Sequence, residues 1–181
     1  TDLGRTAVDA MRKTWQLTAV GGGGILLISL FDGIGAARLA LRQADVPVAG
    51  FVSAECDKLC QRVVHHAFPD AIQVEAVELI DQKFVEKLAV KFPRCSAILV
   101  AGGFPCQPYS DLGKREGWLD SAGRGSLVAH TVALVRKALP AAVLLEIVAS
   151  FCRMDGGRVM RWPYLRVGGP RQIQGFHKDF M

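Results

Sequence analysis

Short hydrophobic runs alternate with amphipathic segments along most of this chain. Five runs rich in branched apolar residues have the length and composition of strands: residues 25–31, 48–54, 71–74, 96–101 and 141–148. Four segments with apolar residues at helical spacing are predicted helices: residues 36–44, 57–67, 81–91 and 126–138. Strands that alternate with helices favour βαβ units and a parallel sheet covered on both faces. The pattern therefore predicts a doubly wound, Rossmann-like α/β fold.

The two ends of the chain do not follow this alternation. Residues 1–20 have the spacing of a short amphipathic helix, and the glycines of residues 21–24 predict a linker. Beyond Ser150, proline and paired glycines interrupt any regular element. We therefore expect an N-terminal extension over residues 1–24, a folded domain over 25–150 and an unassigned basic tail over 151–181.

Composition and charge indicate where the protein works and what it contacts. Half of the residues are hydrophobic, yet no run approaches the ~20 residues of a membrane span, and no signal peptide is recognisable. We expect an intracellular protein without a membrane partner, nuclear if its source is eukaryotic. Five cysteines without regular spacing favour reduced thiols and no metal site. Most of the net charge of +5 lies in residues 151–181, which fits either phosphate-backbone contact or a solvated tail.

Glycines stand where the first predicted strand passes into the first helix. Within Phe31–Gly35 they allow a tight turn and close approach of the backbone to a ligand. Arg38 occupies the third glycine position of a dinucleotide fingerprint, which favours an adenosine ligand without a diphosphate. Glu55 lies 23 residues after Asp32, where an acidic side chain can hydrogen-bond a ribose diol. Turn and acid together predict an adenosine-type cofactor; a plain turn and a structural carboxylate are the alternatives.

A loop that bears a cysteine, Gly102–Ser110, follows the fourth predicted strand. Ligands of open α/β sheets bind beyond the carboxyl ends of the strands, which places this loop at the expected site. Pro105 and Pro108 stiffen the presentation of Cys106, whose thiolate is a strong nucleophile for an electron-poor ring carbon. An inert buried cysteine is the alternative, and it fits poorly between two prolines in a polar loop.

Together these motifs resemble the cytosine-5 DNA methyltransferase family. The resemblance runs from about Ile25 to Val148 and includes Leu30–Gly35, Glu55 and Gly102–Gln107. The Gly113-Lys114 and Arg124-Gly125 pairs add to it. It implies S-adenosylmethionine as the cofactor, with Glu55 on the ribose hydroxyls, and DNA as the partner. The implied cofactor-binding residues are Phe31, Asp32, Gly33, Ile34, Gly35, Glu55, Cys56 and Pro105.

The resemblance also implies a reaction. Cys106 adds to carbon 6 of a cytosine flipped out of the duplex, carbon 5 is methylated, and loss of its proton eliminates the thiolate. Glu146 matches the glutamate of the family's Glu-Asn-Val motif and would hydrogen-bond ring nitrogen 3 and the amino group. A glutamate inside an apolar strand itself favours a functional role. Residues 110–125 resemble the family's DNA-closing loop, and the implied DNA contacts are Gln107, Ser110, Lys114, Arg115 and Arg124.

Three departures from the family pattern limit this interpretation. Ile147 stands where the family has an asparagine that orders the cysteine loop, and residues 74–78 offer no certain aspartate for the adenine. The family continues to further strands, a target-recognition region and a final helix, which residues 149–181 are too few to supply.

We therefore expect a bare apolar sheet edge and weak activity of this chain alone, with a partner subunit as one source of the missing region. Three functions stay open: a DNA methyltransferase or its catalytic half, an inactive module binding DNA or a partner methyltransferase, and a transfer RNA cytosine methyltransferase.

Overall fold

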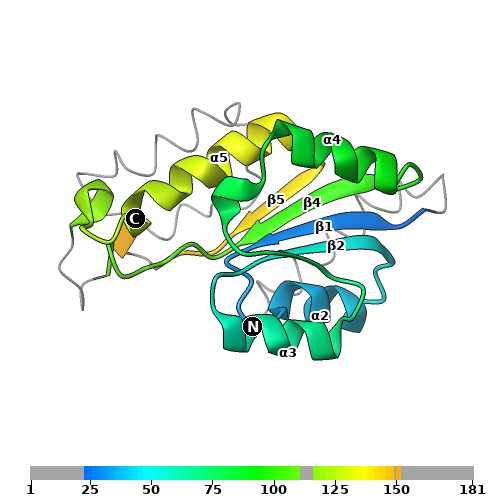
Figure 1. Cartoon of the computed structure of the whole chain (residues 1–181), viewed down its shortest axis with the longest axis horizontal. Coiled ribbons are helices and arrows are strands. Elements are labelled where there is room, and N and C mark those ends of the chain that lie inside the picture. The colour runs from blue at the N-terminus through cyan, green and yellow to red at the C-terminus, as the bar shows by residue number, and fades with distance from the viewer. Residues whose placement is uncertain (1–22, 111–115, 149, 152–181) are drawn as a thin grey trace, which may run out of the picture.

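A computed structural model describes residues 23–110, 116–148 and 150–151, which form a parallel sheet with helices on both faces (Figure 1). The sheet has five strands in the order β3-β2-β1-β4-β5. The strands are β1 Ile25–Leu30, β2 Val48–Ala54, β3 Ile72–Val74, β4 Ala97–Gly102 and β5 Ala142–Leu145. The α-helices are α2 Ala36–Gln43, α3 Lys58–Ala67, α4 Gln82–Lys91 and α5 Leu127–Ala138. Three short 3₁₀ turns are η2 Val77–Leu79, η3 Gly117–Leu119 and η4 Arg124–Ser126.

The central strand β1 is apolar on both of its faces, apart from Ser29, and all six of its residues are buried. Such a run is typical of a parallel strand with helices above and below, because neither face meets water. Asp57 and Asp81 directly precede α3 and α4 and cap them. The Asp57 carboxylate accepts hydrogen bonds from backbone N–H groups in the first turn of α3, and the Asp81 carboxylate accepts one from the first turn of α4. These caps satisfy donors that have no partner within the helix and so fix where α3 and α4 begin.

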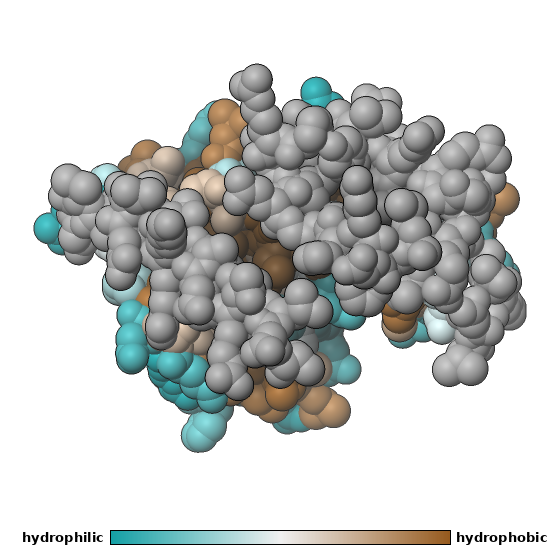
Figure 2. Space-filling model, turned by 180° about the vertical axis from the view of Figure 1, so that it is seen from behind, coloured by the Kyte–Doolittle hydropathy of each residue, from teal (hydrophilic) through white to brown (hydrophobic). Residues whose placement is uncertain are grey.

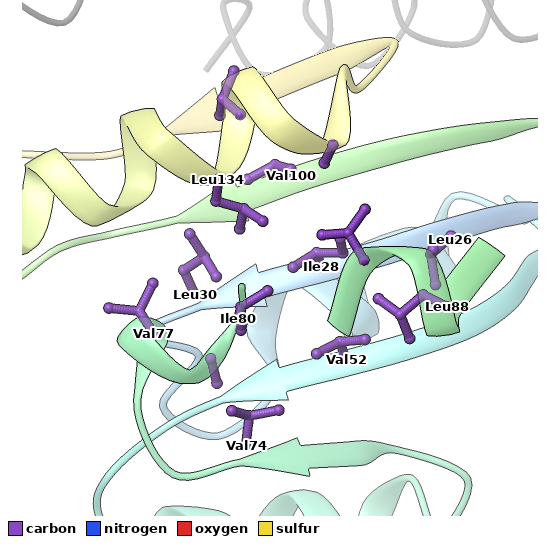
Figure 3. Close-up of a cluster of buried hydrophobic side chains, with 14 residues drawn as sticks. Leu26, Ile28, Leu30, Val52, Val74, Val77, Ile80, Leu88, Val100 and Leu134 are labelled. Carbon is purple, nitrogen blue, oxygen red and sulfur yellow. The ribbon is translucent and has the colours of Figure 1, made fainter. Parts of the chain in front are cut away.

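Two hydrophobic layers hold the sheet between its helices. One layer packs alternate residues of β1, such as Leu26 and Ile28, against Leu88 of α4 and Leu134 of α5 (Figure 3). The opposite layer packs Leu27 with residues of α2, α3 and their flanking segments. The alternation of faces along β1 follows from the two-residue period of a strand.

Strand β5 forms one edge of the sheet, and its apolar side chains are incompletely covered. Val143, Leu144 and Leu145 are 39%, 53% and 39% exposed, although they continue the sheet beside the buried strand β4. The helical layer at the bottom of Figure 1 also shows hydrophobic surface from behind (Figure 2), and it includes the exposed Leu39, Leu59 and Val63. Within the described residues, β5 is thus the terminal strand of the sheet and its apolar side chains are partly exposed.

The predicted fold class and the order of its elements are confirmed, with differences in detail. The fifth strand is shorter than predicted, because it ends at Leu145 and leaves Glu146, Ile147 and Val148 beyond the strand. The predicted polar connection before α5 contains η3 and η4. The proposed helix over residues 1–20 and the tail after Phe151 lie outside the described residues. Within the described part of the chain, no helix is both long and apolar enough to cross a bilayer.

Candidate active site

The strand register brings the predicted site residues to one edge of the sheet. Leu30 of β1 pairs with Ala54 of β2 and with Gly102 of β4, and Gly102 in turn pairs with Leu145 of β5. The residues that directly follow these four are Phe31, Glu55, Gly103 and Glu146. Because all four strands are parallel, the turn after β1, Glu55, the cysteine loop and Glu146 leave the sheet side by side.

The turn between β1 and α2 relies on left-handed backbone at three positions. Gly33 and Gly35 have φ values of 57° and 84°, which glycine adopts without steric cost. A Cβ at Gly35 would lie 3.0 Å from the Phe68 ring, so this position also requires the missing side chain. Phe31 has φ 53°, an uncommon conformation for an aromatic residue. The carboxyl end of β1 thus carries local strain, a frequent property of ligand-binding turns.

The carboxylate of Glu55 ties this turn to the start of α3. Its Oε2 accepts a hydrogen bond from the backbone N–H of Gly33 at 2.9 Å, and its Oε1 accepts one from the backbone N–H of Asp57 at 2.9 Å. The side chain is half-buried. Each carboxylate oxygen can accept a second hydrogen bond, so the ribose contact predicted from the sequence is chemically compatible with this arrangement.

The carboxylate of Asp32 is held by two serine hydroxyls. The carboxylate is buried and accepts hydrogen bonds from the Ser29 hydroxyl of β1 at 2.5 Å and the Ser53 hydroxyl of β2 at 2.6 Å. The two serines are paired in the sheet register. Burial raises the pKa of Asp32 above its ordinary value, although the two hydroxyls act in the opposite direction. Asp32 therefore links the turn after β1 to the two neighbouring strands β1 and β2.

The cysteine loop leaves β4 and forms a tight turn at the nucleophile candidate. The carbonyl oxygen of Cys106 accepts hydrogen bonds from the backbone N–H groups of Tyr109 at 2.9 Å and Ser110 at 2.8 Å. Cys106 is partly exposed, Gln107 is exposed, and Phe104 and Tyr109 on either side are buried. The thiol is thus presented from a turn that is anchored on both sides.

Glu146 lies against the first residue of this loop. Its backbone N–H donates to the Gly102 carbonyl at 2.9 Å, which continues the β4–β5 pairing by one residue. A Cβ at Gly103 would come within 3.1 Å of the Glu146 carboxylate oxygen Oε2. The prediction that Glu146 lies inside an apolar strand is wrong, because β5 ends at Leu145 and Glu146 is exposed. Its carboxylate nevertheless faces the loop that carries Cys106.

An aromatic cluster supports the cysteine loop at Ile147, where the family pattern has an asparagine. Phe104, Tyr109 and Phe151 contact one another edge to face, with ring centroids 4.7–6.3 Å apart, and Val128 of α5 completes their core. Ile147 and Phe31 pack against this cluster. Ile147 thus contributes apolar contact at the position where an asparagine was expected. Edge-to-face rings in such a cluster add stability beyond their buried area.

The predicted DNA contacts divide into three groups. Lys114 and Arg115 lie outside the described residues. Gln107 is exposed beside Cys106, and Ser110 is half-buried at the end of the same turn. Arg124 forms a paired contact with Asp120, in which Nε and Nη2 donate to the carboxylate at 3.0 and 2.6 Å. Arg124 thereby holds the pKa of Asp120 below its ordinary value, and the guanidinium keeps further N–H groups for a phosphate.

The remaining predicted cofactor residues follow the same edge. Ile34 is 62% exposed in the turn, Cys56 is exposed after Glu55, and Pro105 is half-buried before Cys106. Glu55 and burial both raise the pKa of the Cys56 thiol, with burial the larger cause, so this cysteine favours the protonated form. No group of three or more metal-binding side chains occurs in the ranges that the structure describes.

Sequence reasoning missed three supporting residues of this site. Ser29 and Ser53 occur in apolar strands without any motif, and their common partner Asp32 becomes visible only once β1 and β2 are paired. Phe151 follows the last strand and reaches the cysteine loop through tertiary packing. The sequence offered one signal for these serines, because each is a lone hydroxyl residue near the carboxyl end of an apolar predicted strand.

Comparison with known proteins places these features in a family. The family model for C-5 cytosine-specific DNA methylases matches residues 25–162. The chain is 31% identical over 135 residues to the type II methyltransferase M1.ScrFI of Lactococcus lactis, and the match covers 75% of this chain and 31% of that protein. It is 30% identical over 148 residues to the type II methyltransferase M.HhaI of Haemophilus parahaemolyticus, covering 82% of this chain and 39% of that protein.

Solved structures support the fold separately. The methyltransferase EhMeth of Entamoeba histolytica superposes with a TM-score of 0.62 at 20% identity, over 79% of this chain and 43% of that one. The chain thus has the fold of these enzymes while it spans only 31% and 39% of the length of the two curated relatives named above.

The buried Asp32 carboxylate leads to a pH-dependent prediction. Because its pKa is raised above 3.8 in the folded chain, the folded state holds this proton more tightly than the unfolded state. Its contribution to stability is therefore present at acidic pH and is lost as the pH rises through the raised pKa. Asp32→Asn removes this loss, so the variant should gain in unfolding free energy relative to the wild type between about pH 4 and about pH 7.

Urea unfolding at the two pH values measures this difference. Asp70→Asn, which neutralises an exposed carboxylate, controls for the removal of charge alone. A difference between Asp32→Asn and the wild type that stays constant with pH would contradict the assignment.

Proposed function

We propose that this chain, which belongs to the C-5 cytosine-specific DNA methylase family, is the cofactor-binding and nucleophile-bearing part of an enzyme that methylates carbon 5 of cytosine in DNA. The observation that supports this most directly is the position of the Glu146 carboxylate beside Gly103, at the start of the loop that presents Cys106. A nucleophile and a carboxyl group that face one substrate position are the two groups this chemistry requires.

The proposed cofactor is S-adenosylmethionine, held by the turn after β1 and by Glu55. The left-handed glycines leave the backbone open to close approach, and the Glu55 carboxylate is fixed by two backbone N–H groups in an orientation that leaves lone pairs for a ribose diol. When bound, the cofactor supplies an electrophilic methyl group. These residues fit an adenosine ligand, and the third glycine that a diphosphate would favour is absent at Arg38.

In the proposed reaction, the Cys106 thiolate forms a bond to carbon 6 of a flipped cytosine. Glu146 hydrogen-bonds ring nitrogen 3 and the exocyclic amino group, and so stabilises the charge that this addition places on the ring. The ring electrons then make carbon 5 nucleophilic. S-adenosylmethionine, when bound, would supply the methyl group to carbon 5, with its methyl–sulfur bond broken and S-adenosylhomocysteine as the leaving group. A base removes the proton from carbon 5, the carbon–sulfur bond breaks, and the thiolate is regenerated.

DNA binding and any partner protein are also part of the proposal. Gln107 and Ser110 belong to the cysteine loop, and Arg124 directly precedes Gly125, the partner of Tyr109. These three side chains would contact the DNA, and the basic residues of the 151–181 segment would add phosphate contacts. The exposed apolar edge at β5 would accept further strands of the fold, whether from the same polypeptide or from a partner subunit. An intracellular location, nuclear in a eukaryotic source, completes the proposal.

The first prediction concerns the nucleophile. DNA that contains 5-fluorocytosine should trap a covalent adduct with this chain in the presence of S-adenosylmethionine, because fluorine on carbon 5 cannot leave as a proton. The adduct should map to Cys106 by peptide mass spectrometry, and Cys106→Ser should abolish it.

The controls of this experiment separate the alternatives. Cys60→Ser, at a partly exposed thiol away from the loop, should leave the adduct intact. An adduct at Cys56 or Cys60 would refute the assignment of the nucleophile. Trapping on transfer RNA and not on DNA would identify an RNA methyltransferase, while cofactor binding without any adduct would favour an inactive accessory module.

The second prediction concerns the cofactor. Glu55→Ala should weaken S-adenosylmethionine binding by about 1.5–3 kcal/mol, the usual range for hydrogen bonds to a charged group. Calorimetric titration measures the loss, with far-UV circular dichroism as a check that the turn and α3 still fold. Glu86→Ala removes an exposed carboxylate from α4 and serves as the matched control. Equal affinities of Glu55→Ala and the wild type would exclude the ribose contact.

The third prediction concerns the isolated 181-residue chain. Specific DNA interfaces bury about 1,000–2,500 Å² of protein surface, and base flipping requires contacts that repay about a few kcal/mol of lost stacking. The described site offers one loop and one edge for such contacts. We therefore expect this chain alone to transfer labelled methyl groups to duplex DNA far more slowly than a full-length relative assayed beside it. Comparable turnover would show that the chain suffices for recognition.

A further inference from the structure

The side chain of Tyr109 joins the cysteine turn to the segment that begins α5. Its ring is fully buried between Phe104 and Phe151, and its hydroxyl donates a hydrogen bond to the Gly125 carbonyl at 2.6 Å. Gly125 belongs to η4, directly before α5. A single side chain thus connects two segments that are 16 residues apart in the sequence.

Two further close approaches hold the same segments together. The backbone N–H of Gly117 donates to the Pro108 carbonyl at 2.9 Å. A Cβ at Gly125 would come within 1.9 Å of the Gly117 carbonyl oxygen, so only glycine permits this approach. Pro108, Tyr109, Gly117 and Gly125 therefore form one crossing point, which we call the loop junction.

The loop junction is directly coupled to the backbone of Cys106. The Cys106 carbonyl accepts hydrogen bonds from the N–H groups of Tyr109 and Ser110, so the position of Tyr109 sets the geometry of the turn that carries the thiol. Apolar ring contacts alone resist lateral displacement weakly because they have little directionality. The hydrogen bond from the Tyr109 hydroxyl is directional, so it fixes both the orientation of the ring and its depth in the cluster.

We propose that Tyr109 is a positioning residue for the Cys106 thiol, and that its hydroxyl bond to Gly125 fixes the nucleophile turn relative to α5. The proposal rests on the assignment of Cys106 as the nucleophile for its effect on the reaction, but its effect on the thiol can be measured independently. Burial raises the pKa of Tyr109 to about 12, and nearby Asp120 acts in the same direction. The hydroxyl therefore stays protonated and donates its hydrogen bond throughout the working pH range.

Tyr109→Phe is the sharpest test, because it keeps the ring packing and removes only the donor. The first measurement is the rate at which iodoacetamide alkylates Cys106, resolved by peptide mass spectrometry. A released turn exposes the thiol more often, so alkylation should accelerate by roughly 3- to 10-fold, the factor that corresponds to loss of one net hydrogen bond. The rate at Cys60 on α3 should not change.

Ser96→Ala provides a matched control. The Ser96 hydroxyl donates to the Gly24 carbonyl at 2.8 Å at the opposite end of β4, so this variant also loses one hydrogen bond from a side chain to the backbone. It should leave the alkylation of Cys106 unchanged. A general loss of stability would raise alkylation in both variants, whereas a positioning role raises it in Tyr109→Phe alone.

The second measurement is the rate of adduct formation with 5-fluorocytosine DNA. Attack on the base requires the thiol in one position, so this rate should fall in Tyr109→Phe while S-adenosylmethionine affinity stays constant. Opposite changes in the two rates are expected for positioning. An unchanged rate of Cys106 alkylation in Tyr109→Phe would overturn the proposal. If the wild type forms no adduct, the proposed reaction of this chain with DNA fails, and the alkylation rates still decide the role of Tyr109.

Discussion

The parallel hydrogen-bonding register of β1 with β2 and β4 is the constraint on which the site depends. In this register Leu30, Ala54 and Gly102 lie in one row, and the next residue of each strand enters the site. A shift of one residue in any strand would turn its side chains to the other face and move its loop along the edge. A shift of β1 against β2 would separate Ser29 from Ser53 and leave the buried Asp32 carboxylate without one of its two hydroxyl partners, which is costly.

Polar and apolar contacts hold the turn after β1 and the cysteine loop in the positions that this register gives them. Asp32 accepts hydrogen bonds from Ser29 of β1 and Ser53 of β2, so its position depends on the pairing of these two strands. Burial of its carboxylate is tolerated because both oxygens have hydroxyl partners. Phe31 contacts both the main core and the aromatic cluster below the cysteine loop. The turn after β1 and the cysteine loop are therefore supported by one continuous set of contacts, although they are more than 70 residues apart in the sequence.

The aromatic cluster also explains how an isoleucine can stand at position 147. An asparagine orders a neighbouring loop by hydrogen bonds, whereas Ile147 orders it by contact with a cluster that contains Tyr109 and Phe151. Such packing is less directional than hydrogen bonding. The hydrogen bond from the Tyr109 hydroxyl to the Gly125 carbonyl fixes the orientation of the Tyr109 side chain in the cluster. The cysteine loop is thus held by apolar packing, by the Tyr109 hydroxyl bond to Gly125 and by the backbone bond from Gly117 to Pro108.

The sequence by itself determined the fold class, the order of the elements and the cysteine, glutamate and glycine motifs of the site. These follow from local properties: the period of apolar residues, the lack of a side chain at Gly33 and Gly35, and the chemistry of the Cys106 thiol. The end of β5 was mispredicted, because apolar residues resume after Glu146 and reach Val148, although the strand itself ends at Leu145.

Only the tertiary structure decided which side chains support the motifs. The partners of Asp32 depend on strand pairing, the position of Glu146 depends on Gly103, and the anchor of Tyr109 depends on a carbonyl 16 residues away. Contacts between residues distant in sequence have no local signature, since any apolar or hydroxyl residue could occupy those positions until the chain folds. The motifs could therefore be predicted, whereas the contacts that orient them could be found only in the folded chain.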